Sequence, residues 1–325
     1  MFKKILARIL KKPIKLMYYS SLKKIIAEDK AIINKHIVAG QNCSIDPSAI
    51  LTCLENGIIE LEGDNYIGRN VEIGTHASKI FFGFNTSIQD RCIILGDIEI
   101  GRHCVFAPNV YLSSGRHHYN FKPEFYIKDQ DLLVRADKEL SEKYSKKIII
   151  EDDCWLGINV VVMSGIKIGK GSVIGANSVV TKNVEPYSVM VGSPATLIKK
   201  RLDFELKDNI HYLNDTDIPY FYSGFKTNYT NLIENRKNGG IGLFKHFSVY
   251  LKSEGKNEIV VKIKSIKAIR LNYNNQTKEV SSEDYIDVKF DISNDSFHLF
   301  SISHNNDFNY LDLKDCALIQ SILTK

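Results

Sequence analysis

The 325-residue sequence contains no uninterrupted apolar stretch long enough to cross a membrane. Its N-terminal segment, MFKKILARILKKPIKLMYYS, is interrupted by Arg8, Lys11, Lys12 and Lys15, so we do not expect it to provide the apolar core of a secretory signal. Cysteine is scarce and scattered, with no C-x-x-C pair and no zinc-binding spacing, at positions 43, 53, 92, 104, 154 and 316. We therefore expect a cytoplasmic protein with reduced thiols and no bound metal.

A strong charge of one sign is also missing. Lys and Arg total 43 against 38 Asp and Glu, and the net charge of +5 is too diffuse for a dedicated nucleic-acid binder. Small anionic ligands remain open. With 44% hydrophobic and 25% charged residues, the composition is that of a globular chain, and the length suggests two domains at roughly 150 residues each.

The N-terminal segment has one feature of its own. Ile5, Leu6, Ile9 and Leu10 fall on one side of a predicted short helix, with lysines around them. Such a helix could rest on an anionic membrane surface, peripheral to the inner face. The alternative is a helix docked on the protein's own body with its lysines in solvent.

An internal repeat with a period of six residues dominates residues 40 to 202. Apolar residues recur at this spacing in two runs: Phe82, Ile88, Ile94, Ile100, Phe106 and Leu112, then Ile150, Leu156, Val162, Ile168, Ile174 and Val180. Neither a helix nor an alternating strand has that period. It predicts a coil of short strands whose inward aliphatic side chains stack in columns.

Small residues accompany the repeat. Glycines follow several of the apolar positions, where we expect tight corners to need their conformational freedom: Gly83, Gly101, Gly157, Gly169 and Gly175. The position four residues on is often small, as at Thr86, Cys92, Cys104, Cys154, Ser172 and Ser178. Three of the cysteines are thus explained as interior or corner residues.

The stretches IGRNVEIG, IGRHCVFAPNVYLSS and CWLGINVVVMSGIKIGKGSVIGANSVVTKNVEPYSVMVGSPATLIKK resemble the hexapeptide-repeat acyltransferases, in particular the branch that O-acetylates sugars and bacterial polysaccharides. The resemblance implies a left-handed parallel β-helix, a homotrimer with active sites between adjacent subunits, and acetyl-CoA as donor. We expect a mainly β protein with three parts: an N-terminal helical segment (1–38), the β-helix (39–202), and a C-terminal β-rich accessory domain (203–325).

The repeat fails from about His117 to Lys147, in a polar and aromatic loop excursion. A long excursion from a regular solenoid is a typical place for function. It opens with two adjacent histidines, and a neutral imidazole is a suitable base for an attacking hydroxyl. The resemblance implies that His117 is that base and His118 a neighbour or substrate contact. Glu124, Asp129 or a backbone carbonyl are the candidates for orienting the imidazole.

The resemblance assigns two further residues to the acceptor and acetyl sites. Asn85 matches a position whose amide reaches the acceptor sugar, and Trp155 matches an aromatic wall beside the acetyl group. Each has a structural alternative. Asn85 could be a corner residue in a left-handed conformation, and Trp155 could be a buried core residue.

The donor site rests on the same resemblance. It implies that the main chain at Gly157 and Ile158 binds the thioester oxygen, and that Ala176, Thr181 and Lys182 lie along the pantetheine groove. Phosphate contacts would come from Lys199, Lys200 and Arg201; the alternative for these cations is solvated surface charge.

The C-terminal third lacks the six-residue period. Largely alternating segments at 247–251, 259–263, 286–292 and 297–302 predict an antiparallel, sandwich-like β domain, with a last helix near 311–323. Residues 203–238 would link or brace the two parts, and the aromatic residues Tyr212, Tyr220, Phe221 and Tyr222 would stack on sugars or fill an interdomain contact. We expect this domain to bind glycan, shape the acceptor site or hold subunits together.

The function predicted from these features is acetyl-CoA-dependent O-acetylation of a sugar hydroxyl on a bacterial surface glycan or its precursor. One alternative keeps the fold and changes the chemistry, to N-acylation of an amino sugar. The other is a non-catalytic β-helical scaffold that binds glycan. A β-helical carbonic anhydrase ranks last, because His76, His103 and His117 lack that family's spacing.

Overall fold

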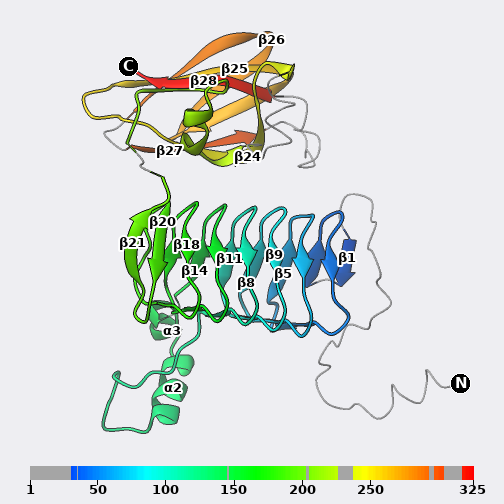
Figure 1. Cartoon of the computed structure of the whole chain (residues 1–325), viewed down its shortest axis with the longest axis vertical. Coiled ribbons are helices and arrows are strands. Elements are labelled where there is room, and N and C mark those ends of the chain that lie inside the picture. Colours follow the sequence, from blue (N-terminus) through cyan, green and yellow to red (C-terminus); the bar gives the residue numbers. More distant parts are fainter. Residues whose placement is uncertain are drawn as a thin grey trace, which may run out of the picture. The chain divides into compact units, whose positions relative to one another are not determined.

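The computed structural model describes residues 31–34, 36–144, 146–202, 205–225, 237–292, 296–303 and 317–325. The chain forms two compact units, Met1–Asp203 and Phe204–Lys325 (Figure 1). The helix expected around Ile5 to Leu10 lies outside the described residues. In their described part, no helix is both long and apolar enough to span a membrane.

The first unit is a parallel β-solenoid with three sheets. Sheet A contains β1 (Ala31–Asn34), β2 (Ile37–Ala39), β5 (Ile58–Leu61), β8 (Lys79–Phe82), β11 (Ile98–Ile100), β14 (Ile148–Ile150) and β17 (Lys167–Ile168). Sheet B contains β3 (Ser44–Ile45), β6 (Tyr66–Ile67), β9 (Ser87–Ile88), β12 (Val105–Phe106), β15 (Trp155–Leu156), β18 (Val173–Ile174), β20 (Ser188–Val191) and β21 (Thr196–Lys200). Sheet C contains β4 (Ile50–Leu54), β7 (Glu72–His76), β10 (Ile93–Leu95), β13 (Tyr111–Ser113), β16 (Val161–Val162) and β19 (Val179–Val180). Since β1 and β2 are strands, the solenoid begins before residue 39.

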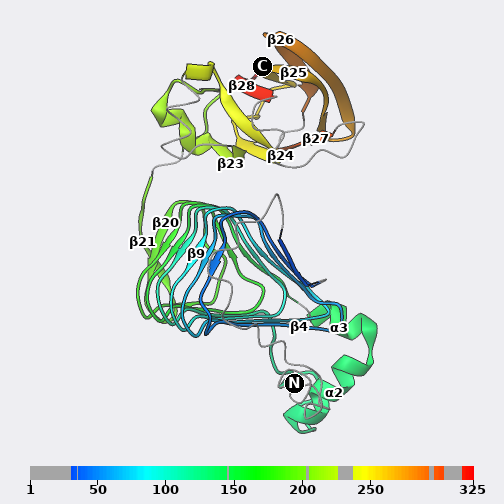
Figure 2. The ribbon, with the colours of Figure 1, turned by 90° about the vertical axis from the view of Figure 1, so that its right-hand side faces the viewer.

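The six-residue period corresponds to one side of each three-sided coil. All twelve residues of the two apolar runs are at most 1% exposed. Equivalent residues stack in parallel register from coil to coil: Phe82 lies beside Ile100, Ile88 beside Phe106, and Ile94 beside Leu112. Viewed along the axis, the coils superimpose as a triangle (Figure 2). Each buried aliphatic or aromatic side chain contributes about 1.5–3 kcal/mol to stability.

The glycines of the repeat serve a different purpose from the one expected. Gly83, Gly101 and Gly157 do not have positive φ angles. A Cβ at each would lie within 2.7 Å of the backbone or a side chain of the next coil, so they are required by close stacking of the coils. The left-handed corner conformation falls two residues later, on residues such as Asn85, His103 and Asn159.

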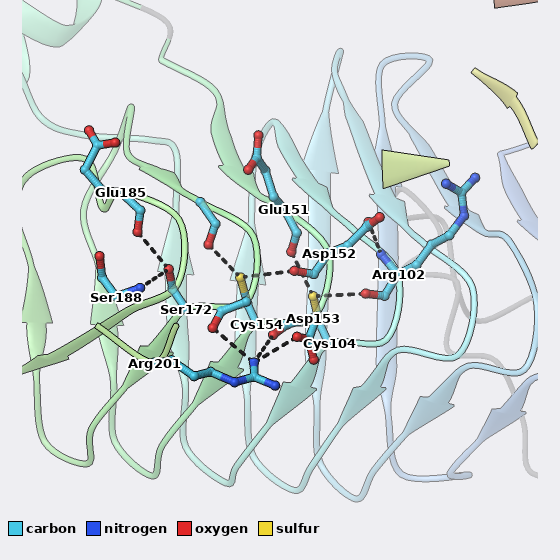
Figure 3. Close-up of polar contacts among 12 residues, drawn as sticks. Arg102, Cys104, Glu151, Asp152, Asp153, Cys154, Ser172, Glu185, Ser188 and Arg201 are labelled. Atoms are coloured by element: carbon cyan, nitrogen blue, oxygen red, sulfur yellow. Dashed lines mark hydrogen bonds and ion pairs between the residues drawn. The ribbon is translucent and has the colours of Figure 1, made fainter. Parts of the chain in front are cut away.

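Three of the small residues of the repeat form a hydrogen-bonded ladder along the A–B corner of the solenoid (Figure 3). Cys104 Sγ donates to the carbonyl of Glu151, Cys154 Sγ to that of Gly169, and Ser172 Oγ to that of Glu185, at 3.2, 3.3 and 3.0 Å. Burial raises the pKa of the Cys154 thiol, as it raises that of Cys92 to about 11. Both therefore stay protonated at neutral pH. The structural explanation of these cysteines is confirmed.

The second unit is an antiparallel β domain, as predicted. Its elements are β22 (Asn209–His211), the 3₁₀ helix η1 (Asp215–Tyr220), β23 (Phe221–Phe225), β24 (Ile241–Tyr250), β25 (Glu258–Tyr273), β26 (Gln276–Asp291), β27 (Phe297–Ser303) and β28 (Ala317–Thr324). The long strands β24 and β25 each pair with both β27 and β28. The four strands β24, β27, β25 and β28 are therefore hydrogen-bonded in a closed ring. Outside it, β22 pairs with β28, β23 with β24, and β26 with β25.

Two expectations for this unit are wrong. Residues 317–323 of the expected last helix instead belong to strand β28, whose alternating burial and position between β25 and β24 show a two-residue period; residues 311–316 of that prediction lie outside the described residues. Short apolar runs do not distinguish helix from strand in sequence. The aromatic residues at 212 and 220–222 are at most 7% exposed. Tyr212, Tyr220 and Phe221 belong to the core of the C-terminal unit, and Tyr222 packs edge-on against Tyr250 and Phe297 of the same unit. They are therefore unavailable for stacking on sugars.

Candidate active site

Residues at the corners of the solenoid occupy regular positions. The A–B corner carries left-handed residues that include Asn85, His103 and Asp153, and the B–C corner carries Asn109, Asn159 and Asn177. The C–A corner carries Gly96 and Gly165. The excursion leaves from this third corner, between β13 of sheet C and β14 of sheet A.

Both ends of the excursion are fixed to regular coils. The Ser114 N–H donates to the Leu95 carbonyl at 3.0 Å, and the Gly165 N–H donates to the Lys146 carbonyl at 3.1 Å. Between these two anchors the chain projects away from the solenoid and forms α2 (Ile127–Ala136) and α3 (Lys138–Tyr144) (Figure 2). The adjacent histidines lie just after the first anchor, so a rigid coil sets their starting position.

A single carboxylate holds both histidines. Asp131, on the buried side of α2, accepts from His117 Nδ1 at 2.6 Å through Oδ2. Its Oδ1 accepts from the backbone N–H of His118 at 2.8 Å and contacts His118 Nδ1 at 3.0 Å. The carboxylate that contacts His117 is therefore neither Glu124 nor Asp129, both of which are exposed. A helical residue fourteen positions downstream supplies it.

The carboxylate is ionised at neutral pH. Burial raises the pKa of Asp131, but the hydrogen bonds from His117 and His118 outweigh burial and lower it to about 2. An ionised carboxylate only accepts hydrogen bonds. Its contacts to the two imidazoles thus favour a proton on each Nδ1 and a lone pair on each Nε2.

The two histidines differ in access. The His117 side chain is 79% exposed, whereas that of His118 is 13% exposed. His118 packs edge-on against Tyr144 of α3 at 4.9 Å between ring centroids, and its Nε2 is buried without a hydrogen-bond partner among the described residues. Only His117 therefore presents an accessible lone pair at the lip of the solenoid.

The neighbouring residue Gln130 secures the loop that carries the histidines. Only 1% exposed, it accepts from the Lys122 N–H at 3.0 Å and donates to the Phe125 carbonyl at 2.9 Å. Gln130 and Asp131 are thus consecutive buried polar residues that organise the turn before α2. The sequence does not predict either residue. Their hydrogen-bond partners lie in an irregular loop, and no local pattern shows that a helix will bury two polar side chains against it.

Asn85 lies in the left-handed conformation that its structural alternative predicts, with φ of 57°. It is nevertheless exposed, and its Nδ2 lies 3.0 Å from His103 Nδ1. Trp155 is 53% exposed on the outer face of sheet B, between Val105 and Val173. The interpretation of Trp155 as a buried core residue is therefore wrong.

The main-chain groups expected to bind the donor differ in whether their N–H has an acceptor within the described part of the chain. The Gly157 N–H donates to Ile174 at 2.8 Å, but the N–H groups of Ile158 and Ala176 have no acceptor in the described part of the chain. Gly157 is required by stacking, since a Cβ there would lie 2.7 Å from the Ala176 nitrogen. The two amides belong to adjacent coils at the B–C corner and remain available for a ligand.

The side chains expected along the remainder of the CoA site divide into an exposed group and a group engaged in contacts within the chain. Thr181, Lys182 and Lys199 are exposed. Lys200 Nζ donates to Ser188 Oγ at 3.0 Å, and Arg201 Nη1 pairs with Asp153 at 2.8 Å (Figure 3). Lys200 and Arg201 thus brace the last coils, which leaves Lys182 and Lys199 as the more accessible of the four cations.

One protomer does not bring all the candidates together. His117 follows sheet C at the C–A corner, whereas Asn85 occupies the A–B corner and Trp155 lies on sheet B. In the described residues there is also no group of three or more His, Cys, Asp or Glu side chains that could hold a metal ion.

Comparison with known proteins agrees with the geometry. Residues 147–182 match the model of the bacterial transferase hexapeptide family (six repeats). A galactoside O-acetyltransferase of Lactococcus lactis is 33% identical over 172 residues, which cover 53% of this chain and 67% of that protein. The chain belongs to the hexapeptide-repeat transferase family. It is an acyltransferase, and within that class an acetyltransferase.

Two further relatives show the range of this family. A probable macrolide acetyltransferase of Lysinibacillus sphaericus is 53% identical over 131 residues, covering 38% of this chain and 71% of that protein. The crystal structure of a hexapeptide-repeat acetyltransferase from Vibrio cholerae is 27% identical and covers 47% of this chain and 72% of that one, with a TM-score of 0.29. Each of these matches spans about half of the chain or less.

Proposed function

We propose that the protein is an acetyl-CoA-dependent O-acetyltransferase that acts on a sugar hydroxyl of a bacterial surface glycan or its precursor. The observation that carries the proposal is His117, whose Nδ1 is held by Asp131 while its side chain is 79% exposed. The galactoside O-acetyltransferase among its relatives supports a sugar acceptor.

In the proposed reaction, His117 Nε2 accepts the proton of the acceptor hydroxyl as the hydroxyl oxygen attacks the thioester carbonyl carbon. The new C–O bond gives a tetrahedral intermediate with a negative oxygen. Collapse of the intermediate breaks the C–S bond, and the leaving thiolate takes the proton from the imidazolium. The products are the acetyl ester and free CoA, with no acyl-enzyme.

The negative oxygen needs a fixed donor. The Ile158 N–H is the proposed one, because it lies on a rigid coil and has no acceptor in the described part of the chain. The equivalent N–H of Ala176, one coil further on, would bind the pantetheine arm. Thr181, Lys182 and Lys199 would line the remainder of the CoA site, with the two lysines near its phosphates.

The outer faces of the solenoid support a homotrimer. Sheet A carries ion pairs such as Glu60 with Lys79 at 2.7 Å and Glu99 with Lys147 at 2.6 Å. Sheet A exposes one large apolar side chain in its described residues, Ile58. Sheets B and C expose more of them, including Tyr66, Val105 and Trp155 on B, Ile50 and Tyr111 on C, and Met163 directly after β16. Sheets B and C would therefore be the faces that pack between subunits.

Such packing would complete the site. If sheet B of one subunit meets sheet C of the next, the A–B corner of the first approaches the C–A corner of the second. Asn85 and Trp155 would then face His117 of a neighbouring subunit, beside the acceptor and the acetyl group. This arrangement accounts for their separation within one chain.

The test is transfer from acetyl-CoA to a panel of sugars and oligosaccharides, with release of the CoA thiol as the readout. We expect thiol release that depends on the acceptor, and a product that gains one acetyl group and loses it in mild alkali, as an ester does. An alkali-stable product would indicate the amino-sugar N-acyltransferase. Absence of acetyl-CoA binding by the folded protein in calorimetry would indicate the non-catalytic scaffold.

A further inference from the structure

The further inference concerns Asp131 and rests on the proposed role of His117. Asp131 is 8% exposed, and its two oxygens serve two different imidazoles. Its geometry does not depend on any ligand, because the contacts to His117 Nδ1, to His118 Nδ1 and to the His118 N–H all lie within the excursion. We propose that Asp131 is a positioning residue that fixes both histidines as the Nδ1–H tautomer.

The consequence differs for each ring. In His117 the tautomer leaves the exposed Nε2 as a lone pair, which is the atom that must accept the acceptor's proton. In His118 it leaves a buried Nε2 lone pair with no partner among the described residues. His118 thus fills the second site on Asp131 and contributes a backbone donor, which holds the carboxylate in place without competing for the substrate.

The amide of asparagine cannot reproduce this arrangement. An asparagine side chain at this position has one accepting oxygen, so it can accept from one imidazole only, while its NH₂ group requires an unprotonated Nδ1 on the other. Asp131→Asn must therefore give up one of the two Nδ1–H contacts, and the histidine that loses it is no longer held in the Nδ1–H tautomer and is expected to adopt the Nε2–H form. Because asparagine and aspartate side chains are nearly equal in volume, we expect Asp131→Asn to fold.

The test uses the full-length protein labelled with ¹⁵N-histidine, whose ring nitrogens report the tautomer by NMR. Assignments come from His117→Gln and His118→Gln. We expect a protonated Nδ1 and an unprotonated Nε2 at both positions in the wild type, and an Nε2–H form of at least one of them in Asp131→Asn. In parallel, kcat should fall roughly 10²-fold or more in Asp131→Asn, with an unchanged Kd for acetyl-CoA.

Two further variants separate positioning from structure. Asp129→Asn removes an exposed carboxylate from the same helix and should change neither tautomers nor kcat. Asp131→Glu keeps two accepting oxygens and should retain the Nδ1–H tautomer of at least one histidine. A wild-type His117 in the Nε2–H form, or wild-type tautomers in Asp131→Asn, would overturn the inference. The NMR readout needs no turnover, so a failure of the proposed function would remain distinguishable.

Discussion

At the scale of single residues, the site consists of one carboxylate and two imidazoles with different access. The sequence predicts the histidine pair, because His117 and His118 open the only long interruption of the repeat. It does not predict Asp131, since the acidic residues of the excursion are equivalent until the fold of α2 buries one of them. Burial and three contacts from the histidines separate Asp131 from Asp129.

The same contacts make the excursion sensitive to acid. The pKa of Asp131 is about 2 in the folded protein, below its ordinary value of 3.8, so the unfolded excursion binds the proton more tightly. The resulting stabilisation is complete above pH 4 and is lost as pH falls towards 2. Hydrogen exchange measured by mass spectrometry, corrected for the intrinsic rate, should show loss of protection in residues 117–144 over this interval.

Asp131→Asn serves as the matched control for that measurement. It removes the titrating group and should give an excursion whose protection is lower at pH 5 and changes less between pH 4 and 2. Equal acid sensitivity in the wild type and Asp131→Asn would show that other carboxyl groups control this region.

At the scale of secondary-structure elements, the sequence predicts the solenoid well, because one inward side chain recurs every six residues and all twelve members of the runs are buried. It predicts the reason for the glycines less well. Gly101 is needed because of a chain segment fifty positions away, at Glu151 and Asp152. A local pattern shows that a residue is small, but not which distant backbone requires it.

Gly101→Ala tests this stacking. A Cβ there would lie 2.5 Å from Asp152 Oδ1 and 2.6 Å from the Asp152 nitrogen, and we expect a loss of about 1–3 kcal/mol in the free energy of unfolding. Gly115→Ala is the control, since the nearest atom to its Cβ would be 3.7 Å away. Denaturant titration should show a lower midpoint for Gly101→Ala alone. Equal midpoints would contradict the stacking explanation.

At the scale of the whole molecule, the ion pairs on sheet A and the exposed apolar side chains on sheets B and C are the basis for proposing B and C as the packing faces of a trimer. The six-residue period is set by the inward side chains, so it does not predict which residues face outward. The homotrimer was therefore predicted from the family resemblance alone. In the C-terminal unit, too, the local sequence pattern predicts only part of the structure. Its strands were predicted from alternation, but β28 was not, because only the long-range pairings with β24 and β25 identify it as a strand.

A shared site between subunits predicts complementation. His117→Ala and Asn85→Ala should each have little activity as pure oligomers. In oligomers reassembled from equal amounts of the two, about a quarter of the sites would combine an intact His117 with an intact Asn85 from different subunits. Activity measured after co-refolding or co-expression should therefore recover to about that fraction. No recovery in proven mixed oligomers would place both residues in the same subunit's site.

The proposed acetyl transfer depends most directly on the accessible imidazole of His117. The measurement is acetyl transfer by His117→Ala, with calorimetric titration of acetyl-CoA into the same preparation and with His76→Ala as an exposed-histidine control from another coil. We predict a kcat lower by roughly 10²–10⁴-fold in His117→Ala, an unchanged Kd for acetyl-CoA, and wild-type values for His76→Ala. Wild-type turnover by His117→Ala would contradict the account.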